Sequence, residues 1–138
     1  MLDVFMEEKD LGYYLASLLK YDLEYVNVIS PQGRILEHAS RNLNLSPQKL
    51  EMLCMGVRLQ HSMQSDFDDD LGTVNYIVTE RANLKFISVP MLSNVILAIL
   101  KKGKDHKPLI DKILSKQFFN ELKTRLDEYN TVAVGIGA

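Results

Sequence analysis

Cys54 and His61 are the first pair of side chains in this sequence that could do chemistry, because a thiol beside an imidazole base is a common start for nucleophilic catalysis. They fall in a stretch of helical periodicity, two turns apart on one face, which is too far for direct contact. Cys54 shares that face with Leu50, Leu53 and Val57, and a cysteine in such company usually packs as a small apolar side chain. The spacing therefore favours a core role for Cys54.

Histidine and acidic residues, the usual metal ligands, form no recognisable site. His38, His61 and His106 fall in three separate predicted elements, without the paired spacing of a zinc site. The acidic run Asp66–Asp70 lacks the alternating oxygen ligands, central glycine and closing glutamate of an EF-hand loop, so we expect a solvated connector. We expect no metal and no cofactor. An enzyme would require His38, His61 and the acidic run to converge after folding.

Phosphate binding and nucleic-acid binding are also disfavoured. The glycines are isolated, and none belongs to a glycine-rich loop that joins a strand to a helix. Sixteen basic and eighteen acidic residues give a formal charge of −2, which offers no general positive surface to nucleic acid. One basic cluster surrounds Gly103 and is more typical of a solvated turn; it consists of Lys101, Lys102, Lys104 and Lys107.

The composition predicts one globular domain in a reducing compartment. A chain of 138 residues, 46% hydrophobic and 25% charged, is long enough and apolar enough to bury a core of its own. The single cysteine excludes an internal disulfide framework and is typical of a cytoplasmic protein. The longest apolar run, Val95–Leu100, is too short to span a bilayer, and no leader peptide is recognisable. We expect neither export nor membrane anchoring.

The first half of the chain predicts two helices separated by a β-hairpin. Apolar residues at helical spacing indicate a helix over residues 2–19. Runs of β-branched and aromatic residues indicate strands over residues 23–29 and 34–39, joined by a turn that contains proline and glycine. Ser46-Pro47 then provides a capping hydroxyl and a proline at the first helical position, which begins a helix over residues 47–64.

The second half predicts three strands and a third helix. The strands cover residues 73–79, 84–89 and 94–100, and the helix runs from Pro108 to about Glu128 with a break allowed near Ser115. Continuous apolarity in the last strand is typical of a central strand that is covered on both faces. The predicted fold is an α+β sandwich of order α-β-β-α-β-β-β-α, a five-stranded antiparallel sheet with helices on both faces, within one domain of residues 1–128. Residues 129–138 are expected to form a flexible tail, and an edge strand over residues 131–138 is the alternative.

The helix over residues 47–64 carries apolar side chains on two opposite sides. The inner side contains Leu50, Leu53, Cys54 and Val57. A helix that packs on a sheet needs only one apolar side. The apolar residues on the opposite side are therefore either buried by more of this chain or exposed for a partner. We favour a partner interface. We call the second set the methionine stripe, and its members are Met52, Met55, Leu59 and Met63.

The order of elements, the turn Ser30-Pro31-Gln32-Gly33, and the long helix followed by three strands together resemble the Roadblock, or dynein light chain, superfamily. Its fold is related to profilin and longin domains. The stretch 58–114 is also similar to uncharacterised archaeal proteins of this shape, through Asp66-Phe67, Leu71–Tyr76, Glu80-Arg81 and Ile110–Leu114. The resemblance implies the spatial strand order 2-1-5-4-3.

The resemblance also implies a function. Roadblock-like domains form dimers through the long helix and an adjacent edge strand, and several regulate or scaffold small Ras-like GTPases or motor complexes. For this chain it implies a non-enzymatic interaction module that forms a homodimer, with a small GTPase as a possible further partner. The implied interface joins the methionine stripe to the strand over residues 73–79, and its residues are Met52, Met55, Leu59, Met63, Thr73, Asn75, Ile77 and Thr79.

A small-ligand sensor is the alternative function. Related α/β sandwiches of the PAS and GAF type hold small ligands between sheet and helices. Such a pocket needs polar groups that face inward from the strands, and the candidates are Asn27, Ser88 and His38.

Overall fold

One antiparallel sheet forms the middle layer of the protein. In the computed structural model, which describes residues 10–137 and their side chains as far as residue 131, its strands are β1 (Leu23–Ile29), β2 (Ile35–Ser40), β3 (Ile77–Glu80), β4 (Leu84–Met91) and β5 (Asn94–Lys101). They lie in the order β2-β1-β5-β4-β3, and each neighbouring pair is antiparallel. The predicted strand number and strand order are both confirmed.

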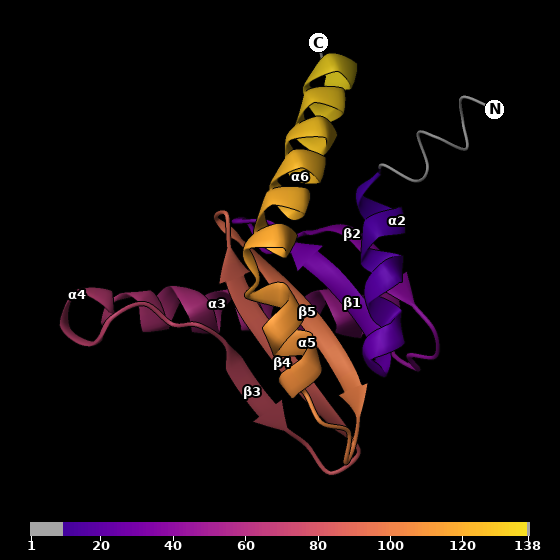
Figure 1. Ribbon diagram of the computed structural model, residues 1–138, viewed down its shortest axis with the longest axis vertical. Coiled ribbons are helices and arrows are strands. Elements are labelled where there is room, and N and C mark those ends of the chain that lie inside the picture. The colour runs from indigo at the N-terminus through magenta and orange to yellow at the C-terminus, as the bar shows by residue number, and fades with distance from the viewer. Residues whose placement is uncertain (1–9, 138) are drawn as a thin grey trace.

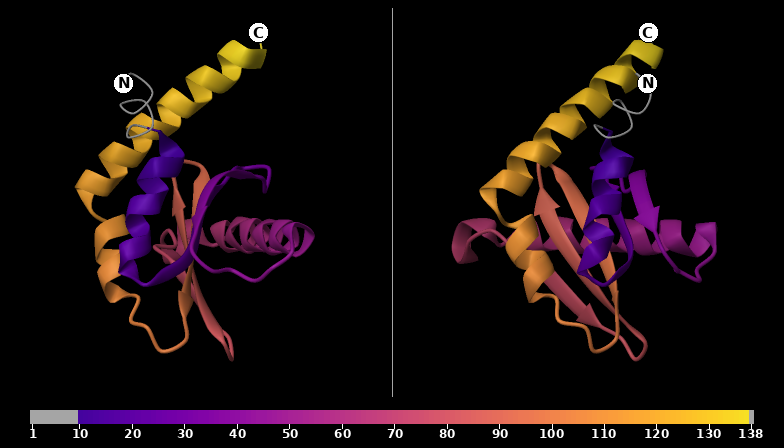
Figure 2. Two further views of the ribbon diagram at one scale, coloured as in Figure 1. Left: turned by 90° about the vertical axis from the view of Figure 1, so that its right-hand side faces the viewer. Right: turned by 45° about the vertical axis from the view of Figure 1, so that its right-hand side comes forward.

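Helices cover both faces of this sheet. They are α2 (Leu11–Ala16), the 3-10 helix η1 (Ser17–Tyr21), α3 (Pro47–Ser65), α4 (Asp68–Leu71), α5 (Lys107–Ile113) and α6 (Lys116–Gly137). Figure 2 shows α3 alone on one face, with α2, α5 and α6 on the other. In Figure 1, α3 runs across the strands and not along them, and α6 extends past the end of the sheet. The predicted covering of both faces is confirmed.

The alternation of side chains along the strands explains these two layers. On β1, Val26 and Val28 pack under α2, α5 and α6, whereas Tyr25 and Ile29 pack under α3. The central strand β5 is buried on both faces from Val95 to Leu100, as its continuous apolarity predicted.

Local capping explains where the long helices begin. Ser46 accepts a hydrogen bond from the backbone N–H of Lys49 at 3.2 Å, and Pro47 occupies the first turn of α3. The hydroxyl of Ser115 accepts a hydrogen bond from the N–H of Phe118 at 3.1 Å, which caps the start of α6. The predicted break near Ser115 therefore separates α5 from α6.

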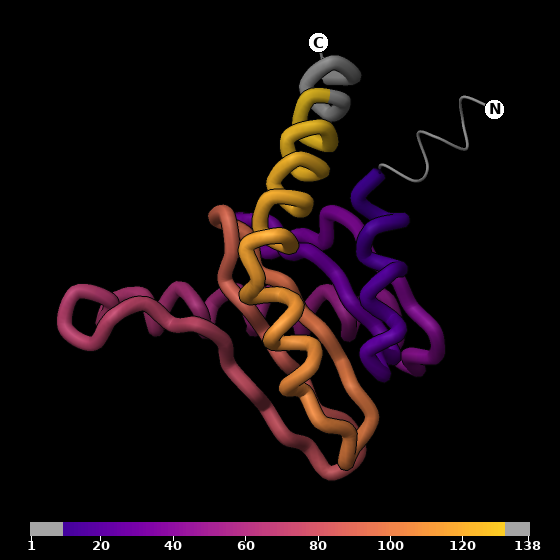
Figure 3. Tube along the Cα trace, viewed as in Figure 1, coloured from indigo at the N-terminus to yellow at the C-terminus, as the bar shows by residue number. Residues whose placement is uncertain are grey.

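The predicted strand over residues 73–79 is wrong at its start, because β3 begins at Ile77. In the observed register Ile77 lies opposite Ser88, so the next pair that could exchange backbone hydrogen bonds is Asn75 and Pro90. Proline has no N–H to donate to a ladder. The chain therefore leaves the sheet before Ile77, and Figure 3 traces its path from α4 to β3.

The predictions for the two ends of the chain have different outcomes. The predicted first helix corresponds to α2 and η1, and its residues 2–9 lie outside the described residues. The edge strand considered for residues 131–138 is wrong, because α6 continues through this segment to Gly137. The acidic connector between α3 and β3 contains the short helix α4.

Candidate functional site

The methionine stripe is exposed on the outer side of α3. The relative exposures are 72% for Met52, 41% for Met55, 55% for Leu59 and 69% for Met63. Cys54, Val57 and other inward residues of α3 pack against the sheet, which turns the stripe toward solvent. None of the described residues buries it, so the alternative that this chain covers its own stripe does not apply to residues 10–131.

Two more exposed apolar side chains follow α3 in the chain. Phe67 and Leu71 follow Met63 at four-residue intervals in the sequence, and they are 53% and 81% exposed. Leu71 belongs to α4, and Phe67 immediately precedes that helix. Neither residue belongs to the stripe predicted from the sequence, because that stripe ends with the helix over residues 47–64. The four-residue interval from Met63 to Phe67 and Leu71 is the sequence signal that could have identified them.

Met55 is less exposed than its neighbours because it packs on the turn between β1 and β2. A Cβ atom at Gly33 would come within 2.6 Å of Met55 Sδ, and Gly33 has φ +82°. Glycine satisfies both requirements, since it tolerates left-handed backbone and leaves room for the thioether. The turn therefore packs against Met55 within the stripe.

The edge strand β3 lies beside this surface. Ile77 and Thr79 lie opposite Ser88 and Phe86 of β4, which places all four on the α3 face of the sheet. Only β4 pairs with β3 among the described strands, so the outer edge of β3 is available. Thr73 and Asn75, also predicted for the interface, are exposed in the loop before β3 instead of in the strand.

The polar strand residues considered for a sensor pocket are engaged elsewhere. Asn27 donates to the Tyr25 hydroxyl at 2.9 Å and to Cys54 Sγ at 3.3 Å. Ser88 Oγ lies 2.7 Å from His61 Nε2. His38 is exposed and stacks on Tyr25 at 5.8 Å between ring centroids. Asn27 and Ser88 thus tie α3 to the sheet and do not line an internal ligand cavity.

Burial sets the protonation of these contacts. It raises the pKa of Tyr25 to about 12 and raises the pKa of the Cys54 thiol, which keeps both groups neutral. Burial, and secondarily the charge of Arg58, lowers the pKa of His61. A protonated thiol is a poor nucleophile, so the burial of Cys54 agrees with a core role.

The residues weighed for catalysis or metal binding have separate partners. Cys54 contacts Asn27, His61 contacts Ser88, and His106 Nδ1 lies 3.1 Å from Lys85 Nζ. Within the part of the chain that the structure describes, no three His, Cys, Asp or Glu side chains gather as metal ligands. In the same part, no helix is long and apolar enough to span a bilayer.

Comparison with known proteins identifies the fold. No protein-family model matches this sequence, and no curated protein matches it. A Roadblock/LC7 domain from Streptomyces avermitilis is similar to this chain with a TM-score of 0.62 and 11% identity, over 91% of this chain and 98% of that domain. MglB from Myxococcus xanthus gives a TM-score of 0.68 and 14% identity, over 86% and 88% of the two chains. An MglB with tetrameric arrangement gives 0.65 and 12%, over 82% and 88%. At these identities the similarity concerns the fold, and this chain has the α+β fold of a Roadblock/LC7 domain.

Proposed function

We propose that this protein is a non-enzymatic protein-interaction module that forms a homodimer through α3 and β3. The observation that carries the proposal is the exposed methionine stripe, extended by Phe67 and Leu71. Apolar surface that continues over several helical turns is uncommon on a monomer and usually marks an interface. Methionine side chains suit such a surface because they are flexible and polarizable.

The unpaired edge of β3 supports the same proposal. Two copies of β3 can pair in antiparallel fashion and join two sheets into one, while the two α3 helices pack across the two-fold axis. Ile77 and Thr79 lie on the α3 face and would contribute side chains to this joint surface. The tetrameric arrangement of an MglB of the same fold is a further reason to expect self-association.

A small Ras-like GTPase is the proposed further partner. This part of the proposal depends on the resemblance to Roadblock-like domains, several of which regulate or scaffold such GTPases. The cytoplasm is the proposed location, because the chain has one cysteine and that cysteine is a buried free thiol.

Replacing Met55 with Glu and Leu59 with Lys together tests the homodimer. Full burial of each side chain is worth roughly 1.5–3 kcal/mol, so losing both should weaken association by about a hundredfold or more. Sedimentation of the wild type should give about twice the monomer mass of 15.8 kDa. The double variant should sediment as a folded monomer, with an unchanged far-ultraviolet circular dichroism spectrum.

A matched control keeps the charge change but moves it off the stripe. Gln60→Lys/Gln64→Glu also adds one charge of each sign to exposed positions of α3, and it should remain dimeric. A monomeric wild type would contradict the proposal. An unfolded Met55→Glu/Leu59→Lys variant would show that the stripe stabilises the monomer instead.

A further inference from the structure

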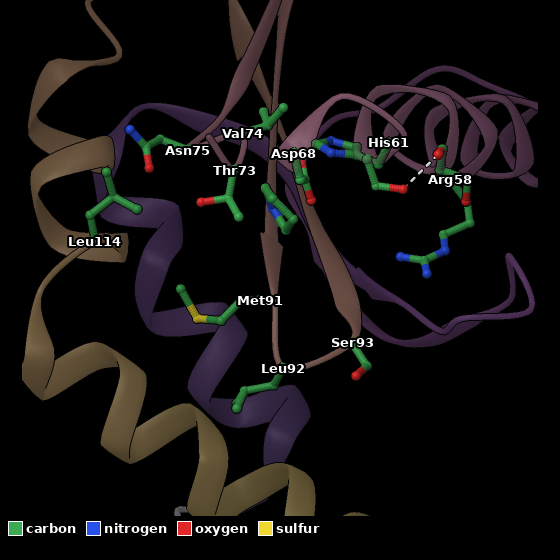
Figure 4. A pocket seen from close by; sticks show the side chains of 13 residues that line it. Arg58, His61, Asp68, Thr73, Val74, Asn75, Met91, Leu92, Ser93 and Leu114 are labelled. Carbon is green, nitrogen blue, oxygen red and sulfur yellow. Dashed lines mark hydrogen bonds between the residues drawn. The ribbon is translucent and has the colours of Figure 1, made fainter. Parts of the chain in front are cut away.

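An open cavity of about 460 Å³ lies where the chain separates from β4 before β3 begins. Its walls are the C-terminal half of α3, the loop over residues 72–76, the β4–β5 turn and the end of α5 (Figure 4). The volume lies within the usual range of small-molecule sites. The cavity exists because Pro90 prevents the loop from pairing with the last residues of β4.

Arg58 lines this cavity from α3. Its Nε atom is buried and has no hydrogen-bond partner among the described residues. In Figure 4 the guanidinium group points from α3 toward the β4–β5 turn. A carboxylate is the acceptor that a guanidinium group binds most specifically, through two parallel hydrogen bonds.

Asp68 supplies the opposite charge in the same cavity. It lines the cavity from α4, whereas Asp69 and Asp70 do not, and it alone among the three is partly buried. Figure 4 shows Asp68 and Arg58 in different walls of the opening. One positive group and one negative group match a ligand that carries both charges and no net charge.

The remaining walls combine polar residues such as Ser62, Ser65 and Thr73 with apolar ones, and they include a strained turn. Val74, Met91, Leu92 and Leu114 line the cavity. Leu92 and Ser93 have φ values of 54° and 66°, a left-handed backbone that residues other than glycine or asparagine adopt only at a cost of about 1 kcal/mol or more. Asn-Gly would form this two-residue turn without strain. Leu92 instead keeps an apolar side chain at the cavity wall.

From this arrangement we propose that the cavity binds a free α-amino acid with an apolar side chain. The carboxylate of the ligand pairs with Arg58, its ammonium group pairs with Asp68, and its side chain packs on Leu92 and Leu114. This site lies beside the proposed dimer interface and does not depend on dimerisation.

Titration of the full chain with L-leucine, L-isoleucine, L-methionine and L-phenylalanine tests this site, with amide chemical shifts as the measurement. At least one should give saturable shifts at Val74, Met91 and neighbouring amides. N-acetyl-L-leucine lacks the ammonium group and L-leucinamide lacks the carboxylate, so each should bind about tenfold more weakly than L-leucine, or weaker still. Absence of saturable shifts with all four amino acids up to about 10 mM would overturn the proposal.

Two variants assign the charges. Arg58→Gln and Asp68→Asn should each weaken binding of the best amino acid by about tenfold or more. Arg41→Gln and Asp69→Asn change exposed residues of the same types outside the cavity and should bind as the wild type does. Unchanged binding by Asp68→Asn, or equal binding of N-acetyl-L-leucine and L-leucine, would also overturn the proposed amino-acid site. Asp68 lies near the surface, so that variant is informative even if Arg58→Gln does not fold. The oligomeric state, measured by sedimentation, reports on the dimer independently.

Discussion

His61 is the buried polar side chain that connects α3 to β4. Its ring nitrogen Nε2 and the hydroxyl of Ser88 are 2.7 Å apart, beneath a helix whose outer side is apolar and exposed. Burial makes the charged imidazolium costly there, and Arg58 adds to that cost, so the pKa of His61 lies below its usual 6.5. The neutral ring is therefore part of what stabilises the α3 layer.

The lowered pKa of His61 makes the stability of the protein depend on pH in a defined direction. Below pH 6.5 the unfolded chain takes up a proton at His61 that the folded chain does not, so the free energy of unfolding should fall as pH drops. The decrease due to His61 is at most about 1.4 kcal/mol per pH unit and ends below the lowered pKa. Urea denaturation at pH 7.5, 6.5 and 5.5 measures it.

His61→Gln is the matched variant, because glutamine can still hydrogen-bond to Ser88 and does not titrate. The difference between wild type and variant should shrink or reverse as pH falls from 7.5 to 5.5. Equal pH dependence in both proteins would mean that His61 does not contribute to it.

At the scale of elements, Pro90 decides the length of β3. It lies opposite Asn75 in the register that Ile77 and Ser88 define, at a position where the ladder requires an N–H. The short strand has two consequences. It leaves an edge of only four residues for the proposed dimer, and it opens the cavity that Arg58 faces.

Pro90→Val should lengthen β3 toward Asn75, because valine restores the missing donor and favours extended backbone. One added hydrogen bond is worth about 1 kcal/mol, so amide hydrogen exchange near Asn75 should slow by several-fold to about tenfold. Exchange measured by NMR on both proteins gives the comparison, with the β2 amides as an internal control. Unchanged exchange near Asn75 would show that the loop is held away from β4 by other contacts.

At the scale of the whole molecule, the two helical layers differ in extent. The α2, α5 and α6 layer contributes buried residues such as Leu15, Ile113 and Phe118, whereas the α3 layer rests mainly on Cys54 and Val57. Less apolar burial means a smaller free energy of local opening. The α3 layer is also the one that carries the proposed interface.

Native-state hydrogen exchange should reflect this difference. Amides of α3 should exchange through an opening of lower free energy than amides of β5, which is buried on both faces. If α3 packs against a second copy, its protection should also rise with protein concentration, while that of β5 should change less. Equal protection of α3 and β5 at all concentrations would contradict the prediction.

The sequence by itself determined those features that depend on local patterns. Continuous apolarity from Val95 to Leu100 identified the central strand, because only a strand covered on both faces hides such a run. The hydroxyl of Ser46 marked the start of α3, because a cap needs only neighbouring backbone. Two apolar sides on one helix identified the methionine stripe in the same way.

Tertiary structure decided those features that depend on residues distant in sequence. The start of β3 depends on Pro90 in another strand, which the pattern of residues 73–79 cannot indicate. The roles of Asn27 and Ser88 depended on α3, because its side chains reach both and remove them from any ligand cavity. The presence of Arg58 and Asp68 in the walls of one cavity likewise required the path of the chain from α4 back to the sheet, because local periodicity carries no information about which distant walls meet.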